Sequence, residues 1–203
     1  HMSGLNILLL NASSIFGGGE YFVLHLSLNL KKRGHNVFIG CRDSGLLYEK
    51  CISEGIEVIP FDFPEKGTGG LGKNIKAIRD FSARNNIDII HSNTNYDRTA
   101  GAFASRGIRA NHVTSCHSLE SIQHNITHFI RNRFLTKHFI CDGSTIQKLI
   151  VAKNHIPAFK TTVVHNGIDP DDMKRDPEQR KKIRKEFGVT DDEILIGNTG
   201  RMV

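Results

Sequence analysis

Short apolar segments alternate with longer amphipathic segments along most of the chain, and this alternation restricts the fold more than any other feature of the sequence. Apolar strands that are separated by helices imply a parallel sheet covered by helices on both faces. Right-handed crossovers then give an α/β, Rossmann-like, doubly wound domain. The strands are expected at Asn6–Leu10, Val37–Gly40, Glu57–Phe61, Ile87–His91, His112–Cys116, His138–Cys141 and Thr161–Val164.

Helices are expected in the segments between these strands. The segment from Glu20 to Arg33 is ambiguous, because its leucines fit a strand as well as a helix, but its length and its basic end before Gly34 favour a helix. Asp97 and Ser144 are expected to cap two of the others. The remaining predicted helices cover residues 45–53, 71–85, 98–106, 122–136 and 144–153.

The end of the chain follows a different pattern. Asp176 and Pro177 are typical of a helix start, the helix that follows is highly charged, and residues 194–196 predict a new strand. We therefore expect a Rossmann-like domain over residues 3–172. Residues 173–203 are expected to be a linker helix and the first strand of a truncated second domain.

Charge and cysteine content narrow the classes of partner. The net charge of +6 attracts phosphate-bearing molecules, but the basic residues are spread out and form no nucleic-acid-binding motif, so nucleic acid is not an expected partner. The four cysteines include no Cys-x-x-Cys pair, and no apolar run has the length of a transmembrane helix. We expect a cytoplasmic protein with reduced thiols.

Glycines follow the first strand at Gly17, Gly18 and Gly19, next to Glu20. Glycines before a helix let backbone N–H groups approach a phosphate. The dinucleotide-binding fingerprint is incomplete, because Phe22 stands at its third glycine position. A tight turn that binds nothing is the alternative interpretation.

Polar side chains follow the fourth and fifth strands, where a doubly wound sheet binds its ligands. Hydroxyl-rich substrates such as sugars need many hydrogen bonds, and these side chains can supply them. The residues are His91, Ser92, Asn93, Asn95, Tyr96 and Arg98 after the fourth strand, and His117, Ser118 and Glu120 after the fifth. For His91, packing at the edge of the core is the favoured interpretation.

Two other segments have a functional and a simpler interpretation. Asp169 and Asp171 have the Asp-x-Asp spacing of a cation site, but their proline-containing loop favours a turn, and no metal is expected. The predicted helix over 122–136 is amphipathic and basic, so it can lie on an anionic membrane as a peripheral contact on the inner face. An ordinary crossover helix with a solvated face is the simpler interpretation.

A family resemblance is carried by four parts of the sequence. The segment Val163-Val164-His165-Asn166-Gly167-Ile168-Asp169 resembles the one that closes the N-terminal domain in the retaining glycosyltransferase family 4, of GT-B architecture. The segment from Ile196 to Val203 is similar to the strand and Gly-Arg turn that open the C-terminal domain of that family. The glycine loop and His117 also occupy matching places.

The resemblance implies roles for individual residues. The donor would be a nucleotide-diphosphate sugar, and its diphosphate would face Gly17, Gly18, Gly19 and Glu20. His117 would contact the transferred sugar or the acceptor, and Arg201 would neutralise the leaving diphosphate. The hydroxylated acceptor would be a saccharide or a lipid-linked molecule. Its expected contacts are Asn93, Asn95, Tyr96 and Arg98.

The resemblance further implies retention of anomeric configuration, with no metal and no other cofactor. The family's lysine after the Gly-Arg turn, its nucleotide-binding loops and its E-x7-E segment are not in these 203 residues. We therefore expect the chain to fold but not to catalyse transfer alone. Three alternatives stay open: a nucleotide-sugar 2-epimerase of the same fold, a nicotinamide-binding Rossmann domain, and a non-catalytic sugar-binding module.

Overall fold

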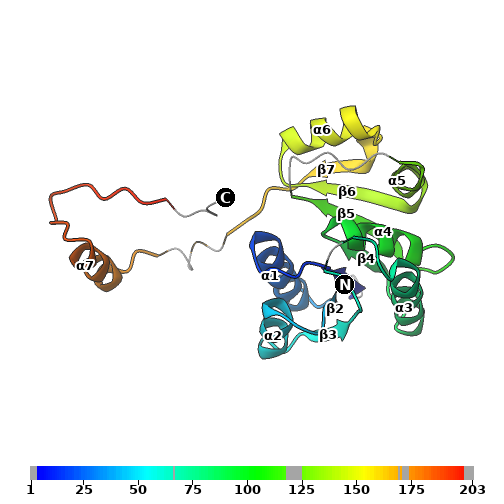
Figure 1. Ribbon diagram of the computed structural model, residues 1–203, viewed down its shortest axis with the longest axis horizontal. Helices are drawn as coiled ribbons and strands as arrows, with labels where there is room; N and C mark the ends of the chain where they lie inside the picture. The colour runs from blue at the N-terminus through cyan, green and yellow to red at the C-terminus, as the bar shows by residue number, and fades with distance from the viewer. Residues whose placement is uncertain (1–3, 66, 118–124, 169, 171–173, 199–203) are drawn as a thin grey trace. The chain divides into compact units, whose positions relative to one another are not determined.

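Residues 6–163 contain a seven-stranded parallel sheet in the computed structural model of the protein, which describes residues 4–65, 67–117, 125–168, 170 and 174–198 (Figure 1). Contacts within the chain define two compact units, residues 1–166 and 167–203. The strand order is β3-β2-β1-β4-β5-β6-β7. This arrangement confirms the predicted doubly wound α/β fold. The strands are β1 (Asn6–Leu10), β2 (Asn36–Cys41), β3 (Glu57–Pro60), β4 (Ile89–Ser92), β5 (Asn111–Cys116), β6 (Thr136–Cys141) and β7 (Thr161–Val163).

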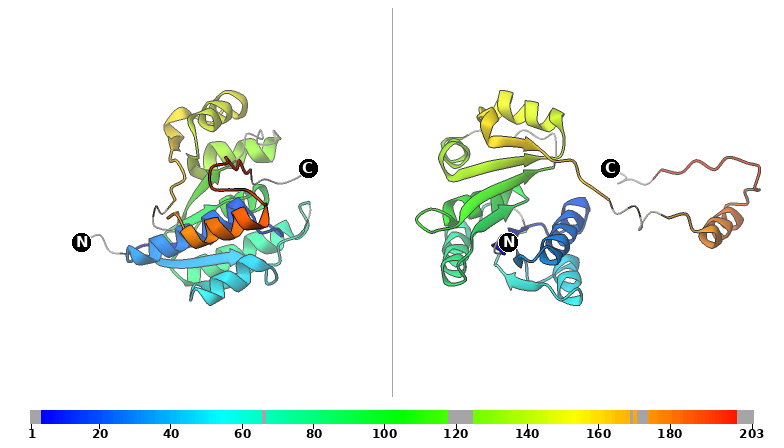
Figure 2. Two further views of the ribbon diagram at one scale, coloured as in Figure 1. Left: turned by 90° about the vertical axis from the view of Figure 1, so that its left-hand side faces the viewer. Right: turned by 180° about the vertical axis from the view of Figure 1, so that it is seen from behind.

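Helices cover both faces of this sheet (Figures 1 and 2). Leu8 and Leu10 of β1 pack in one apolar cluster with residues of α3 (Leu71–Arg84) and α4 (Asn95–Ala104). Ile7 and Leu9 pack in another cluster with residues of α1 (Gly18–Lys32) and α2 (Leu46–Ser53). Because successive side chains of a strand point to opposite faces, a run of four apolar residues suits a strand that is buried on both sides. The helices of this unit are α1 (Gly18–Lys32), α2 (Leu46–Ser53), α3 (Leu71–Arg84), α4 (Asn95–Ala104), α5 (Ile126–Ile130) and α6 (Ser144–Asn154).

A buried polar layer replaces apolar packing between β4, β5 and β6. His112 is fully buried, and its ring nitrogens lie 3.0 Å from Ser92 Oγ and 3.1 Å from Thr136 Oγ1. His91 Nε2 lies 2.8 Å from Ser115 Oγ. Burial lowers the pKa of His91 to about 4 and that of His112 well below its usual value, so both rings are neutral at pH 7.

Two predicted helix caps differ from the structure. The cap of α4 is Thr94, and Asp97 stands inside the first turn, where its carboxylate completes a capping box with Thr94. The cap of α6 is Gly143 rather than Ser144, and it has no side-chain hydrogen bond. In both cases the chain enters the helix earlier than the sequence pattern indicated.

The predicted helix over 122–136 is also corrected. The described part is a short α-helix, α5, which continues as a π-helical turn, η1 (Arg131–Leu135), while residues 122–124 lie outside the described residues. The next strand begins at Thr136, two residues before the predicted start. The π-helical turn shortens the segment that could form a long amphipathic helix.

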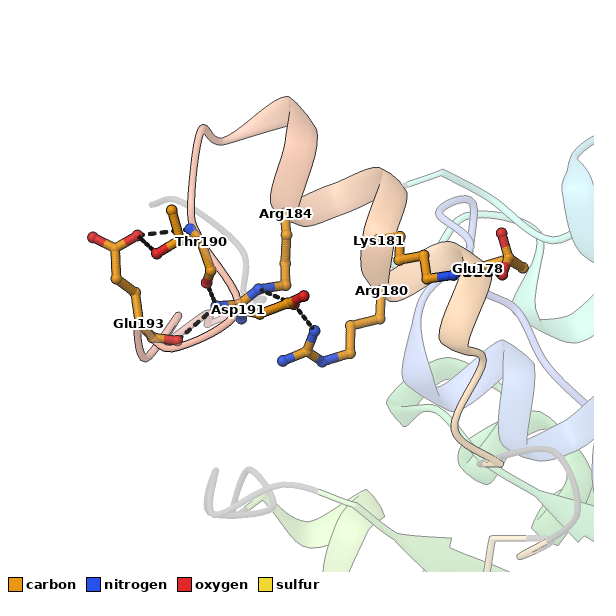
Figure 3. A network of polar contacts seen from close by, with 7 residues as sticks. All are labelled: Glu178, Arg180, Lys181, Arg184, Thr190, Asp191 and Glu193. Carbon is orange, nitrogen blue, oxygen red and sulfur yellow. Dashed lines mark hydrogen bonds and ion pairs between the residues drawn. The ribbon is translucent and has the colours of Figure 1, made fainter.

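The second unit consists of the charged helix α7 (Pro177–Glu186) and the segment after it. Asp176 Oδ1 accepts hydrogen bonds from the backbone N–H groups of Glu178 and Gln179, as the predicted helix start requires. Figure 3 shows that the Arg184 guanidinium donates to the carbonyl oxygens of Thr190 and Glu193, which holds the following turn against the helix.

Residues 194–196, where a strand is predicted, do not form a strand in the described part of the chain. Ile194 and Ile196 are each 88% exposed, and the segment has no strand assignment. A strand needs a neighbour that accepts and donates its backbone hydrogen bonds. The described part of residues 167–198 contains no second strand that could do so. Separately, no helix among the described residues is long and apolar enough to cross a membrane.

Candidate functional site

The candidate site lies at the carboxyl edge of the sheet, in the loops that follow β1, β4, β5 and β6. The strand order reverses direction between β1 and β4, which are neighbours in the sheet. Ligands of open α/β sheets bind at such a reversal, because the adjacent loops separate there and leave a crevice. The predicted site residues of the glycine loop, of residues 93–98 and of His117 all belong to this edge.

Glu20 holds the glycine loop in place. The Glu20 side chain is buried, and its carboxylate accepts hydrogen bonds from Gly17 N at 2.8 Å and Asn11 Nδ2 at 3.2 Å. Glu20 therefore positions the loop, and its carboxylate is already bound by these two donors. A Cβ atom at Gly18 or Gly19 would meet nothing within 4 Å, so open space lies over the start of α1.

Asp97 joins the loop that follows β1 to the loop that follows β4. Its buried carboxylate accepts hydrogen bonds from the backbone N–H groups of Ala12, Asn93 and Thr94, at 2.8–2.9 Å, and from Thr94 Oγ1 at 2.7 Å. Burial raises the pKa of Asp97 to about 6, although these hydrogen bonds favour the charged form. The sequence predicted a helix cap here, and the structure adds the connection to Ala12, 85 residues earlier in the chain.

Two of the predicted acceptor contacts are buried. Arg98 is 5% exposed, and its guanidinium donates to Thr114 Oγ1, to Asn95 Oδ1 and to the Ser115 carbonyl. Because Arg98 is buried and its guanidinium already donates to these three groups, the structure does not support its predicted direct contact with an acceptor. Asn93 is 8% exposed, and its Nδ2 donates to the Leu10 carbonyl, but its buried Oδ1 has no partner among the described residues.

The other two predicted acceptor contacts, Asn95 and Tyr96, border a cavity of about 640 Å³. The Tyr96 hydroxyl is already used, because it donates to the Gly69 carbonyl and accepts from Asn74 Nδ2. Tyr96 thus contributes its ring, while Asn95 is exposed. The described lining residues are Ala12, Ser13, Pro64, Glu65, Gly67, Thr68, Leu71, Thr94, Asn95, Tyr96, Thr99, Asn125, Thr127, His128 and Arg131.

His117 lies directly after β5 and is oriented by Asp142, which follows β6. The distance from His117 Nδ1 to Asp142 Oδ2 is 2.8 Å, and Asn166 Nδ2 donates to the same oxygen at 3.1 Å. A carboxylate only accepts, so Nδ1 carries the proton and Nε2 of the neutral ring is an acceptor. Nε2 is buried and has no partner among the described residues. Phe22 of α1 packs edge-on against the ring at 4.7 Å.

Sequence reasoning missed Asp142 and Arg131 as parts of this edge. Asp142 has only one signal, its place directly after a strand, and that rule could have selected it. Arg201, Asp169 and Asp171 lie outside the described residues. Among the described residues, no group of three histidine, cysteine or acidic side chains is arranged to hold a metal ion.

The fold and this edge define a class of protein: an open, doubly wound α/β domain, the kind that binds ligands at the carboxyl ends of its strands. The family model of Glycosyltransferase Family 4 matches residues 16–172. The chain therefore belongs to glycosyltransferase family 4, which confirms the resemblance found in the sequence.

Curated relatives include two phosphatidylinositol N-acetylglucosaminyltransferase proteins. The chain is 29% identical, over 92% of its length, to the GPI3 subunit of that enzyme from Saccharomyces cerevisiae. It is 26% identical, over 81% of its length, to a subunit of the corresponding enzyme from Homo sapiens. The matched region spans 43% and 36% of those two proteins, respectively.

Solved structures share the fold. A glycosyltransferase from Rickettsia africae has a TM-score of 0.80 at 20% identity, with 93% of this chain and 51% of that chain covered. Anabaena Alr3699/HepE in complex with UDP-glucose has a TM-score of 0.73 at 23% identity, with 91% and 50% covered. The sheet and its helices thus match half of each of these larger proteins.

Proposed function

We propose that this chain is the acceptor-side domain of a retaining glycosyltransferase that moves a sugar from a nucleotide-diphosphate sugar to a hydroxylated acceptor. Membership of family 4 supports the transferase class. The HepE structures contain UDP and UDP-glucose, which supports a nucleotide-sugar donor. The chain spans about half or less of the length of these proteins, so the proposed activity is that of a protein with both halves.

The observation that carries the proposal is the buried acceptor atom of His117. Asp142 and Asn166 fix the ring so that Nε2 is available, and Nε2 has no partner in the described part of the chain. A buried acceptor without a partner costs free energy that a ligand hydroxyl would recover. Nε2 would accept a hydrogen bond from a hydroxyl of the transferred sugar or the acceptor. Asn93 Oδ1, which has no partner among the described residues either, offers a second acceptor after the neighbouring strand.

The glycine loop would receive the donor diphosphate. Gly18 and Gly19 leave the first turn of α1 uncovered, and a helix start attracts negative charge. The Glu20 carboxylate accepts hydrogen bonds from Gly17 N and Asn11 Nδ2, so the loop keeps its shape before the donor binds. In the complete protein, Arg201 would neutralise the departing diphosphate, and no metal ion or other cofactor enters this scheme.

A membrane surface is proposed as an additional partner. Ile126, Phe129, Phe134 and Phe159 are 73%, 47%, 64% and 78% exposed, and Arg133, Lys137 and Lys160 belong to the same part of the chain. Exposed aromatic side chains with nearby cations favour binding to anionic lipid. Sedimentation with anionic and with neutral vesicles tests this contact. Equal and negligible binding to both would rule it out.

Product analysis of the full-length protein tests the main proposal. A mixture of nucleotide sugars and hydroxylated acceptors should yield a glycoside with the donor's anomeric configuration. Conversion of the donor into its 2-epimer without transfer would instead establish the epimerase alternative. Carbohydrate binding without any turnover would establish a binding module.

A further inference from the structure

Arg131 is a fully buried cation without a counterion among the described residues. Its side chain is 1% exposed, Nη1 donates to Thr99 Oγ1 at 2.8 Å, and Nε donates to Asn132 Oδ1 at 2.9 Å. Nη2 is buried and has no partner in the described part of the chain. No ion pair of the described residues includes Arg131. A buried charge is normally paired, so this arrangement is incomplete as it stands.

A second positive charge lies close to Arg131, which makes the shortage of negative charge in this region greater. Arg98 is a second buried guanidinium close enough to lower the pKa of Arg131 electrostatically, after the larger effect of burial. The nearby Cys116 acts in the opposite direction, and the resulting pKa of Arg131 is about 9, so the side chain is still charged at pH 7. The nearby ring of His112 is neutral for the same reasons. Two buried guanidinium groups therefore share one region, and Asp97, the buried acid of α4, is already bound by four donors.

The cavity beside Asn95 and Tyr96 is the open space next to Arg131. Arg131 and its partner Thr99 both line this cavity, which has a volume of about 640 Å³. Its other polar lining groups are mostly hydroxyls and amides, including Ser13, Thr127 and Asn125. The titratable lining groups besides Arg131 are Glu65, Tyr96 and His128; the Glu65 carboxylate is 76% exposed and lies 3.6 Å from Arg42. Arg131 also begins the π-helical turn, a local distortion that is frequent at functional sites.

We propose that Arg131 binds an oxyanion, a phosphate or a carboxylate, carried by the hydroxylated acceptor in this cavity. The inference rests on the proposed function for the identity of the ligand as the acceptor. The Nη2 group of the planar guanidinium forms no hydrogen bond with a described residue. Guanidinium groups match the oxygen geometry of phosphate and carboxylate. The surrounding hydroxyl and amide groups would bind the neutral, hydroxylated part of the acceptor.

Thermal unfolding of the 203-residue chain tests the proposal without any sugar donor. The probes are inorganic phosphate and acetate, glycerol 3-phosphate as a soluble phosphorylated polyol, a water-soluble short-chain phosphatidylglycerol as a lipid headgroup, and glycerol as the neutral control. Sodium chloride at matched ionic strength corrects for screening. A ligand that binds the folded state raises the melting temperature, so the anionic polyols should raise it more than glycerol or chloride does.

Substitution at Arg131 separates binding from folding. Arg131→Met should keep or raise the melting temperature without ligand, because it removes an uncompensated buried charge, and should weaken anion binding at least about tenfold. Arg109→Met is the matched control, since Arg109 is 75% exposed and pairs with Asp88 at the opposite edge of the sheet; it should keep the anion-induced shift. Arg131→Lys should retain weaker binding, because lysine keeps the charge and loses the fork.

If Arg131→Met does not fold, NMR titration of the wild-type chain gives the answer. The side-chain resonance of Arg131, assigned by its loss in Arg131→Lys, should shift on addition of phosphate. Equal anion-induced stabilisation of wild type and Arg131→Met, or no shift of that resonance, would overturn the proposal. Full-length Arg131→Met that transfers sugar to its acceptor at the wild-type rate would also overturn it, while leaving the transferase function intact.

Discussion

Nδ1 of His117 lies 2.8 Å from Oδ2 of Asp142, although 25 residues separate the two in the chain. The two residues meet because β5 and β6 are adjacent and parallel, so the residues that directly follow them emerge at the same edge. Asn166, which follows β7, reaches the same carboxylate oxygen. Three consecutive strand ends thus combine to give one oriented imidazole.

Asp142→Asn should lower the kcat of the full-length enzyme by at least about tenfold, with a smaller change in the donor KM. The neutral amide no longer fixes the proton on Nδ1 by charge, so Nε2 of His117 loses its defined role as an acceptor. Steady-state kinetics with a nucleotide-sugar donor measure both constants. Asp80→Asn, on an exposed part of α3, is the control and should retain wild-type kinetics. A fully active Asp142→Asn enzyme would exclude the proposed role of this pair.

Gly19→Ala should stabilise the fold slightly and weaken donor binding. Alanine favours a helix over glycine by up to about 1 kcal/mol, and its Cβ would meet nothing within 4 Å. The methyl group would, however, enter the space proposed for the diphosphate. Urea unfolding of this chain and the donor KM of the full-length enzyme measure the two effects.

Gly72→Ala is a matched control for that experiment. Gly72 lies in the first turn of α3, and a Cβ there also meets nothing within 4 Å. It should stabilise the fold to a similar extent and leave the donor KM unchanged. The same KM change in both variants would argue against a diphosphate site at the start of α1.

Asp97→Asn should destabilise the protein by about 1–3 kcal/mol. The carboxylate accepts from three backbone N–H groups and one hydroxyl, and an asparagine NH2 would face donors that it cannot satisfy. Urea unfolding monitored by circular dichroism gives the free energy of unfolding. The exposed residue Asp43 provides the control Asp43→Asn, for which we expect little change. Unchanged stability of Asp97→Asn would mean that this carboxylate does not hold the two loops together.

Stability should fall as the pH is lowered from 6.5 towards 4. His91 and His112 bind protons in the unfolded chain near pH 6.5, but burial lowers their pKa in the fold, to about 4 for His91. The unfolded state therefore takes up more protons in this window, and each histidine costs about 1 kcal/mol of stability at pH 5.5. The effect of Asp97 on stability has the opposite sign, because its pKa of about 6 lets the folded state take up a proton as the pH falls. This effect offsets the cost of only one of the two histidines.

Urea unfolding at pH 7.5 and pH 5.5 measures this dependence. His91→Gln removes one of the two titrating groups, so the difference in stability between the two pH values should become smaller. The partly exposed residue His35 serves as a control, and His35→Gln should leave that difference close to the wild-type value. A wild-type chain that is equally stable at both pH values would contradict the buried, neutral state of the histidines.

The sheet was predictable because each strand of a doubly wound domain is a local, apolar segment bounded by helix signals. Leu8, Leu9 and Leu10 are fully buried, as a strand covered on both sides requires. The polar layer around His112 was not predictable in the same way. Its hydrogen bonds to Ser92 and Thr136 exist only because three strands are adjacent, and nothing in the sequence near His112 indicates those partners.

The sequence by itself determined the order of strands and helices, the glycine loop, the position of His117 after a strand and the family to which the chain belongs. Only the tertiary structure decided what those residues do. It turned Glu20 and Arg98 inward, joined Asp142 to His117, and buried Arg131 beside a cavity with no counterion among the described residues. The reason is physical: periodicity and turn signals act over a few residues, whereas burial and charge pairing depend on which distant segments the sheet brings together.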